Sequence, residues 1–168
     1  AFPLPGQPLP GRHEVDAVYQ HALIETDYAT LTAHQQRFVD AMRDATVRVT
    51  TPLGTDIQFR IGDRPVNFQD GDASAERTGR GVVLIDREIE LPAGAIRVAP
   101  LEETVQGTIV FPSSQWAGRP VEGLRIQVEN GRVVGLDATS GLDAVQAELD
   151  SVPDAARAFR EFALGFNP

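Results

Sequence analysis

The chain has 168 residues, of which 42% are apolar and 23% are charged, and its formal net charge is −9. These values are typical of a globular domain that can bury a core, and the acidic charge argues against a nucleic-acid partner, which needs a basic face. Cysteine is absent and every basic residue is arginine. Disulfides, thiolate metal sites and lysine Schiff bases are therefore excluded, and any metal must be held by carboxylates or imidazoles.

No apolar segment approaches the roughly 20 residues that a bilayer-crossing helix needs, and no signal peptide is recognisable. We therefore expect a cytoplasmic protein with no membrane partner. The chain does not begin with methionine, which indicates processing or a fragment.

The N-terminal third predicts an arm followed by two helices. Residues 1–13 are rich in proline and predict an extended arm. Apolar residues at helical spacing predict a helix over 14–23 and a second helix capped by Thr26 or Asp27. The apolar side of the second helix is predicted to comprise Tyr28, Leu31, Phe38, Met42 and Ala45. His34 falls near this side, and we expect it to be partly buried.

Alternating apolar residues then predict a sheet. Residues 47–50 and 55–61 are predicted to form a hairpin, and the polar stretch 66–81 is predicted to be a surface loop. Asp70 and Asp72 in that loop lack the spacing of a calcium loop, so a solvated turn is expected. Glu102 and Glu103 precede a strand over 108–111 and are also expected to be solvated.

The C-terminal third predicts another hairpin and two helices. Asn130 and Gly131 supply the positive-φ residues of a type I′ turn between the strands of 124–136. One helix is predicted over 142–152, and another is predicted to begin at Pro153 and end at Gly165. The expected fold is α+β, with a mixed or antiparallel sheet with hairpins, an N-terminal helical arm and two C-terminal helices, in a single domain over 14–168.

Few residues suggest catalysis by themselves. His13, His21 and His34 all lie in the N-terminal arm and helices, so no histidine accompanies the predicted sheet. Glu161 follows Arg157 by four residues, which is the spacing of an ordinary ion pair on a helix surface. Taken alone, Glu161 would be a surface residue.

Four segments in a fixed order resemble a known family. They are TTPLGTDIQF at 50–59, LPAGAIRVAPLEETVQGTIVF at 91–111, VEGLRIQVENGRVV at 121–134 and REFALGFNP at 160–168. Together they resemble the thermophilic aminopeptidase family of metallopeptidases, the aminopeptidase T and aminopeptidase S type. The resemblance covers roughly residues 24–168 and lacks the N-terminal domain and the C-terminal histidine ligands of that family.

The resemblance implies a two-metal site built from two glutamates, a histidine and a His-x-Asp pair. One family glutamate corresponds to Glu161, which is therefore expected to be a metal ligand. The other family glutamate corresponds to Ala95, whose methyl group cannot coordinate a metal. The resemblance thus implies a metal-dependent hydrolase that removes N-terminal residues from peptides in its complete form, with this 168-residue chain inactive by itself.

The same resemblance implies a divalent metal such as zinc or cobalt in the complete enzyme, a peptide substrate, and a homo-oligomer or dimer, or association with a missing domain. Two alternatives stay open. A mononuclear-iron ring-cleaving dioxygenase on the same scaffold also lacks the first glutamate, although it has a histidine where this chain has Glu161. A non-catalytic binding or assembly module would fit Ala95 and the acidic charge.

Overall fold

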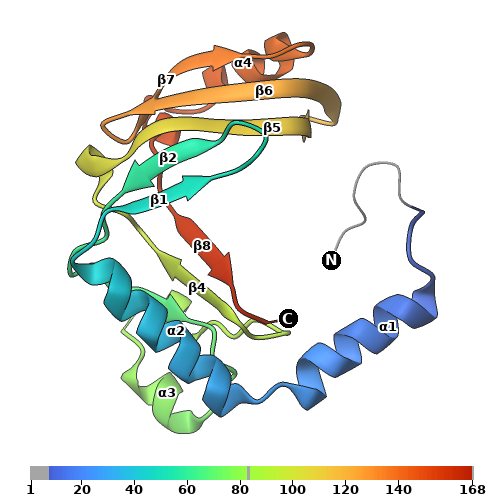
Figure 1. The fold of residues 1–168 in the computed structure, drawn as a ribbon, viewed down its shortest axis with the longest axis vertical. Helices are drawn as coiled ribbons and strands as arrows, with labels where there is room; N and C mark the ends of the chain where they lie inside the picture. The colour runs from blue at the N-terminus through green and yellow to red at the C-terminus, as the bar shows by residue number, and fades with distance from the viewer. Residues whose placement is uncertain (1–7, 83, 168) are drawn as a thin grey trace. The chain divides into compact units, whose positions relative to one another are not determined.

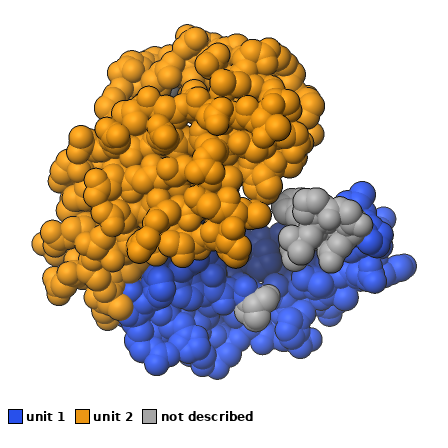
Figure 2. All heavy atoms as spheres, turned by 45° about the horizontal axis from the view of Figure 1, so that its top comes forward, with its two compact units in different colours: residues 1–38, 67–97, 163–168 blue, residues 39–66, 98–162 orange. Residues whose placement is uncertain are grey.

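The computed structural model describes residues 8–82 and 84–167 and has the expected α+β fold (Figure 1). The chain divides into two compact units, which are coloured separately in Figure 2. Unit 1 comprises Ala1–Phe38, Asn67–Arg97 and Ala163–Pro168, and unit 2 comprises Val39–Val66 and Val98–Phe162. Most of the predicted proline-rich arm lies outside the described residues. Within the described part of the chain, no helix is long and apolar enough to cross a membrane.

The two N-terminal helices begin differently: Gly11 precedes the first, where its amide donates to the Glu14 carboxylate (2.8 Å), and a polar side chain caps the second. Helix α1 (Arg12–Gln20) continues into a π-helical turn, η1 (His21–Glu25). Helix α2 (Tyr28–Arg43) follows Asp27, whose carboxylate accepts hydrogen bonds from the Thr30 amide (3.1 Å) and the Thr30 hydroxyl (2.6 Å). The prediction of a cap at Thr26 or Asp27 is therefore confirmed for Asp27. These bonds lower the pKa of Asp27.

The buried side of α2 differs from the predicted one. It comprises Leu31, Gln35, Val39 and Met42, each no more than 5% exposed. Phe38 is 37% exposed, and Ala45 and His34 are exposed too, so their predicted burial was wrong. The prediction was right for Leu31 and Met42, but it omitted Val39 and the polar Gln35.

The segment predicted as a surface loop contains secondary structure. It forms strand β3 (Val66–Phe68) and helix α3 (Ala75–Arg80), and a 3-10 turn, η2 (Leu84–Arg87), follows. The side chain of Ser74 caps α3 by accepting a hydrogen bond from the Arg77 amide (3.2 Å). β3, β4 (Ala95–Val98) and β8 (Phe162–Gly165) form a three-stranded sheet with β4 in the middle.

Unit 2 contains a five-stranded antiparallel sheet in the order β1-β2-β5-β6-β7 (Figure 1). β1 (Val47–Thr50) and β2 (Asp56–Phe59) form the predicted hairpin. A 3-10 turn, η3 (Glu102–Thr104), leads into the long strand β5 (Gln106–Trp116), which pairs with β6 (Arg119–Glu129). Glu102 and Glu103 are exposed, as expected.

The predicted turn at Asn130 and Gly131 is confirmed. Their φ angles are 48° and 74°, and they join β6 to β7 (Arg132–Asp137) with Glu129 opposite Arg132. A Cβ on Gly131 would lie 2.4 Å from the Glu102 carbonyl oxygen. The second tight turn of the sheet, at Ala117 and Gly118, also has positive φ angles, of 48° and 75°.

The helix predicted over 142–152 forms as α4 (Leu142–Asp150), and it packs on this sheet. The buried core between them comprises Val121, Leu124, Ala144 and Val145, with Trp116, Ile126, Leu136, Ala138 and Leu149 around it. Each of the four core residues is no more than 2% exposed. This apolar cluster stabilises the sheet by removing aliphatic surface from water.

The second predicted C-terminal helix is absent. Pro153 precedes only a short 3-10 turn, η4 (Asp154–Arg157), after which the chain is extended and ends in β8. Phe159 and Phe162 lie against the ring of Phe59, with centroids 6.3 and 4.9 Å apart. The aromatic residues whose spacing suggested a helix therefore lie on extended backbone. Residues 162–165 of β8 alternate between half-buried and exposed.

Candidate functional site

Residues 90–95, here called the 90–95 loop, contain the Ala95 position and lead into β4 in unit 1. The loop turns at Gly94, whose φ angle is 137°. A Cβ at this position would lie 2.7 Å from the Cβ of Asn167, so only glycine fits without displacement. The Gly94 carbonyl oxygen accepts a hydrogen bond from the Phe166 amide (2.7 Å). Both the conformation and the close contact therefore require glycine here.

The side chain of Gln69 holds the beginning of the loop. Gln69 is 1% exposed, its Oε1 accepts from the Glu90 amide (2.8 Å), and its Nε2 donates to the Glu88 carbonyl oxygen (3.2 Å). Its backbone is bound to the end of the loop, because its amide donates to the Ala95 carbonyl oxygen (2.8 Å) and its carbonyl accepts from the Gly94 amide (2.6 Å). Gln69 thus connects both ends of the loop.

Gln35 of α2 reaches the same backbone. It is 0% exposed, and its Nε2 donates to the carbonyl oxygens of Gln69 and Ala95, each at 3.2 Å. Its Oε1 is buried and has no hydrogen-bond partner among the described residues. A buried amide whose oxygen lacks a hydrogen-bond partner lowers the stability of the fold. Gln35 therefore has an unfavourable side to its burial on the interior face of α2.

Asn167 is the third amide of this network, here called the amide clamp together with Gln35 and Gln69. Its Nδ2 donates to the carbonyl oxygens of Ala93 (2.9 Å) and Ala22 (3.2 Å) and to the Thr26 hydroxyl (3.3 Å). The amide clamp fixes the loop backbone from a helix, from the end of β3 and from the C-terminal segment. Sequence reasoning found none of its members.

The charged groups beside Ala95 form an ion pair. Ala95 is half-buried and precedes Arg97 by two residues on β4, so both side chains lie on the same face of the strand. Arg97 pairs with Glu90 at the start of the loop, and both side chains are about one-third exposed. The loop therefore presents a methyl group and a neutralised carboxylate.

Glu161 lies in unit 2 immediately before β8 and is exposed. The helix that would have placed it one turn after Arg157 does not form, and Arg157 is bound instead to Asp150 at 2.6 Å. The expectation of a helical ion pair is therefore wrong. The assignment of Glu161 as a metal ligand stays a prediction.

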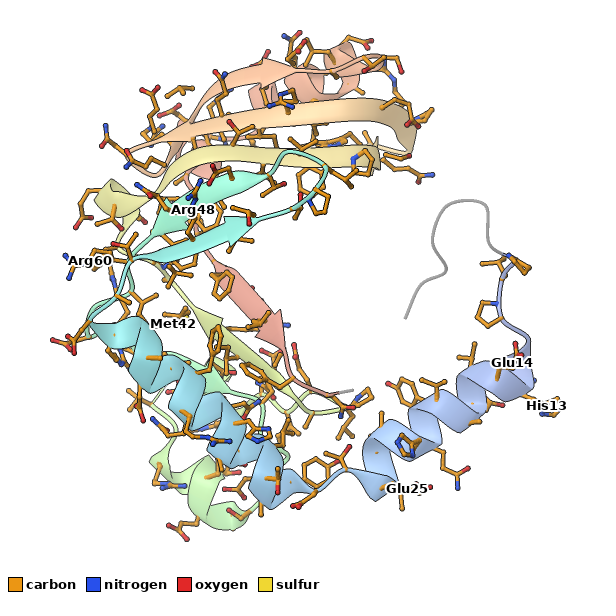
Figure 3. All side chains as sticks on the ribbon, in the orientation of Figure 1. His13, Glu14, Glu25, Met42, Arg48 and Arg60 are labelled. Atoms are coloured by element: carbon orange, nitrogen blue, oxygen red, sulfur yellow. The ribbon has the colours of Figure 1, made fainter. Side chains whose placement is uncertain are left out.

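The three histidines lie on the N-terminal helices, as expected. His13 and Glu14 lie at the start of α1 and Glu25 at the end of η1 (Figure 3). His21 Nδ1 lies 2.8 Å from Glu25 Oε2, and both residues border a pocket with His34. Among the residues that the structure describes, no three histidine, aspartate or glutamate side chains are grouped so that they could hold a metal ion.

Asp70 and Asp72 have structural partners. Asp70 binds Arg77 at 2.6 Å, and both side chains are less than one-quarter exposed. The Asp72 carboxylate accepts the Ser74 amide (2.9 Å), and hydrogen bonds from Ser74 lower the pKa of Asp72. The Asp70 pair is more buried than the expected solvated turn implies.

A sequence profile of a family described as "Thermophilic metalloprotease (M29)" matches residues 24–168. The chain belongs to this family. The match includes the 90–95 loop, all three members of the amide clamp and Glu161.

Among solved structures, the chain is similar to wild-type AmpT from Thermus thermophilus, with a TM-score of 0.62 and 24% sequence identity. The similarity covers 98% of this chain and 42% of AmpT, so the chain spans less than half the length of that relative. At this identity the similarity shows the fold. No protein with a curated functional description matches the sequence.

Membership of the M29 family implies a divalent metal in a complete enzyme. The residues present do not fit such a centre by themselves, because Ala95 offers no donor atom and the described residues contain no group of three possible ligands. A catalytic metal normally has about three protein ligands. No chemical step through a metal is therefore assigned to these residues.

Proposed function

We propose that the chain is part of a metal-dependent, aminopeptidase-like hydrolase that removes N-terminal residues from peptides in its complete form. The match of residues 24–168 to the M29 family carries this proposal. The amide clamp supports it, because a loop fixed at three points by side-chain amides has the rigidity that a site needs. The 168-residue chain alone is inactive in this proposal.

The proposal assigns one metal ligand, Glu161, to this chain. Peptides are the substrate class, and a divalent metal such as zinc or cobalt is the cofactor, with its other ligands supplied by residues beyond those described. Homo-oligomerisation, or association with a further domain, and a cytoplasmic location belong to the same proposal. A metal bound in the complete protein would supply an activated water and would polarise the scissile carbonyl.

The complete protein, purified from its source, tests the proposal by intact mass, metal content and release of the first residue from an aminoacyl fluorogenic substrate. We expect bound metal and N-terminal hydrolysis, and Glu161→Gln should lower both by about a hundredfold. Glu103→Gln, an exposed carboxylate that the proposal does not use, is the control. A complete protein without metal and without hydrolysis would contradict the proposal and favour a binding module, as Ala95 also does.

Ala95→Glu in the 168-residue chain tests the role of the missing donor separately. We expect the substitution to raise the zinc bound per chain, because it adds a carboxylate at the position that corresponds to a family ligand. Ala99→Glu adds the same charge to an exposed site after β4 and should leave zinc binding unchanged. Tight zinc binding by the unmodified chain would contradict our conclusion that Ala95 removes a ligand.

A further inference from the structure

A groove in unit 2 follows the free edge of the five-stranded sheet. It is bordered by four consecutive residues of β7, Val133, Val134, Gly135 and Leu136, and on the other side by Gln146, Asp150 and Arg157. Successive side chains of a strand point to opposite faces. Four consecutive residues can therefore border one groove only if it runs along the edge of the strand, where the backbone is accessible.

This edge is open beyond its first residue. β7 is the last strand of the sheet, and within residues 8–82 and 84–167 its outer side is paired only at the beginning, through the bridge between Arg132 and Ala158 and a hydrogen bond from the Phe159 amide to the Gly131 carbonyl (2.7 Å). From residue 133 onward, no further strand of the described chain lies beside it. Unpaired amides and carbonyls at a sheet edge are a template for another extended chain.

The opposite edge of the sheet is protected by charge. β1 carries Arg48, which is bound to Asp56 of the neighbouring strand by hydrogen bonds of 2.7 and 2.6 Å. Charged residues on an edge strand discourage pairing with other chains. The stretch of β7 that borders the groove has no charged residue and no proline. Of the two edges of this five-stranded sheet, the β7 edge therefore has the composition that suits pairing.

The far side of the groove presents a carboxylate to solvent. Asp150 binds Arg157 at 2.6 Å, but the Asp150 side chain is 71% exposed whereas that of Arg157 is 29% exposed. A cationic group entering the groove would therefore meet Asp150 first. The formal net charge of −9 adds a long-range attraction for basic partners.

We propose that the groove between β7 and α4 binds an extended peptide segment that carries a basic side chain. The peptide backbone pairs with residues 133–136 as a sixth strand, and its lysine or arginine lies beside the Asp150 carboxylate. Backbone pairing supplies the affinity, and Asp150 selects the charge. This inference does not depend on the metal-dependent reaction proposed above.

Fluorescence anisotropy with a short, dye-labelled peptide of alternating threonine and lysine residues tests the proposal on the 168-residue chain. A second peptide of the same sequence, with N-methyl groups on alternate amides, keeps the charge and loses one edge of backbone donors. We expect N-methylation to weaken binding about tenfold. Equal binding of the two peptides would overturn the proposal, because it would show attraction by charge alone.

Variants locate the site. Asp150→Asn should weaken binding about fivefold, and Val134→Lys, which places a repelling charge on the 54% exposed edge residue, should weaken it about tenfold. Glu148→Gln removes one exposed charge from the same helix outside the groove and should change binding less than about twofold. Binding that is lost equally in Glu148→Gln, or a dimer of the chain that Val134→Lys dissociates, would overturn the proposal.

Discussion

The 90–95 loop of unit 1 and the sheet of unit 2 are held by opposite kinds of interaction. The loop is fixed by the amide clamp, whose members Gln35 and Gln69 are almost fully buried. The sheet is held by an aliphatic cluster around Leu124 and Val145 with no polar member. Apolar packing stabilises without fixing individual backbone atoms, whereas hydrogen bonds to named carbonyls add little net stability but define the position of the loop.

The largest expected effect is a loss of packing in the sheet. Leu124→Ala should lower the free energy of unfolding by about 3 kcal/mol, because Leu124 is 0% exposed and its truncation leaves a cavity. Urea unfolding measures the loss, and hydrogen exchange should show faster opening of β5, β6 and β7. Slower or unchanged exchange in these strands would contradict the role given to the aliphatic cluster.

Gly94→Ala tests the loop with the next largest effect. A side chain at a φ angle of 137°, with a Cβ 2.7 Å from that of Asn167, should cost roughly 2 kcal/mol. Gly79→Ala is the matched control, since nothing lies within 4 Å of a Cβ at that position. The two variants are compared by thermal unfolding, and equal melting temperatures would show that the loop adapts.

Gln35→Leu should produce a smaller and local effect. It removes hydrogen bonds to the Gln69 and Ala95 carbonyl oxygens, both of which keep other partners, so we expect a loss of about 1 kcal/mol. Amide exchange should become faster for residues 90–95 and stay unchanged in β5 and β6. Arg37→Leu, at an exposed position of the same helix, serves as the control. A stabilised protein with an unchanged loop would mean that the clamp does not position it.

The smallest effect concerns acid titration. Hydrogen bonds and charge from Arg48 lower the pKa of Asp56 in unit 2, and hydrogen bonds from Thr30 lower the pKa of Asp27 in unit 1. A carboxyl whose pKa is lower in the folded state contributes stability above its unfolded pKa of about 4 and loses it as pH falls through the folded pKa. Melting temperature should therefore decrease as the pH is lowered from about 5 through that range.

Salt should change the pKa values of these two carboxyl groups by different amounts. The pKa of Asp56 should rise towards its ordinary value in about 1 M salt, because an exposed ion pair is screened. The pKa of Asp27 should change less, because its partners are a hydroxyl and backbone amides. Nuclear magnetic resonance titration of the two carboxyl groups measures the difference, and equal salt shifts would contradict it.

The sequence was informative where short-range chemistry decides the structure. Asn130 and Gly131 predicted their turn because positive φ angles are local properties, and Asp27 predicted its cap for the same reason. The segment after Pro153 was predicted wrongly because its aromatic residues face Phe59, which is distant in the chain. The same apolar spacing is compatible with a helix and with an irregular segment that ends in a strand, and the sequence alone does not show that Phe59 is the partner.

The candidate site was less accessible from the sequence. The resemblance indicated Ala95 and Glu161 by position, whereas the amide clamp joins residues from α2, from the position after β3 and from the C-terminal segment. Glutamine and asparagine count as polar in a periodicity analysis, so an apolar pattern does not predict their burial. The one available signal was the spacing of Leu31, Gln35, Val39 and Met42, in which Gln35 occupies an interior position of the helix.

The turn at Gly131 limits which sequences this fold can tolerate. Its amide donates to the Val105 carbonyl oxygen (2.9 Å), and a Cβ there would meet the Glu102 carbonyl at 2.4 Å. Gly118 has a similar φ angle but nothing within 4 Å of a Cβ. In a library randomised at both positions, asparagine and aspartate should therefore survive at 118, while 131 should accept glycine alone. Two turns of the same type thus differ in tolerance because one is surrounded by backbone and the other by water.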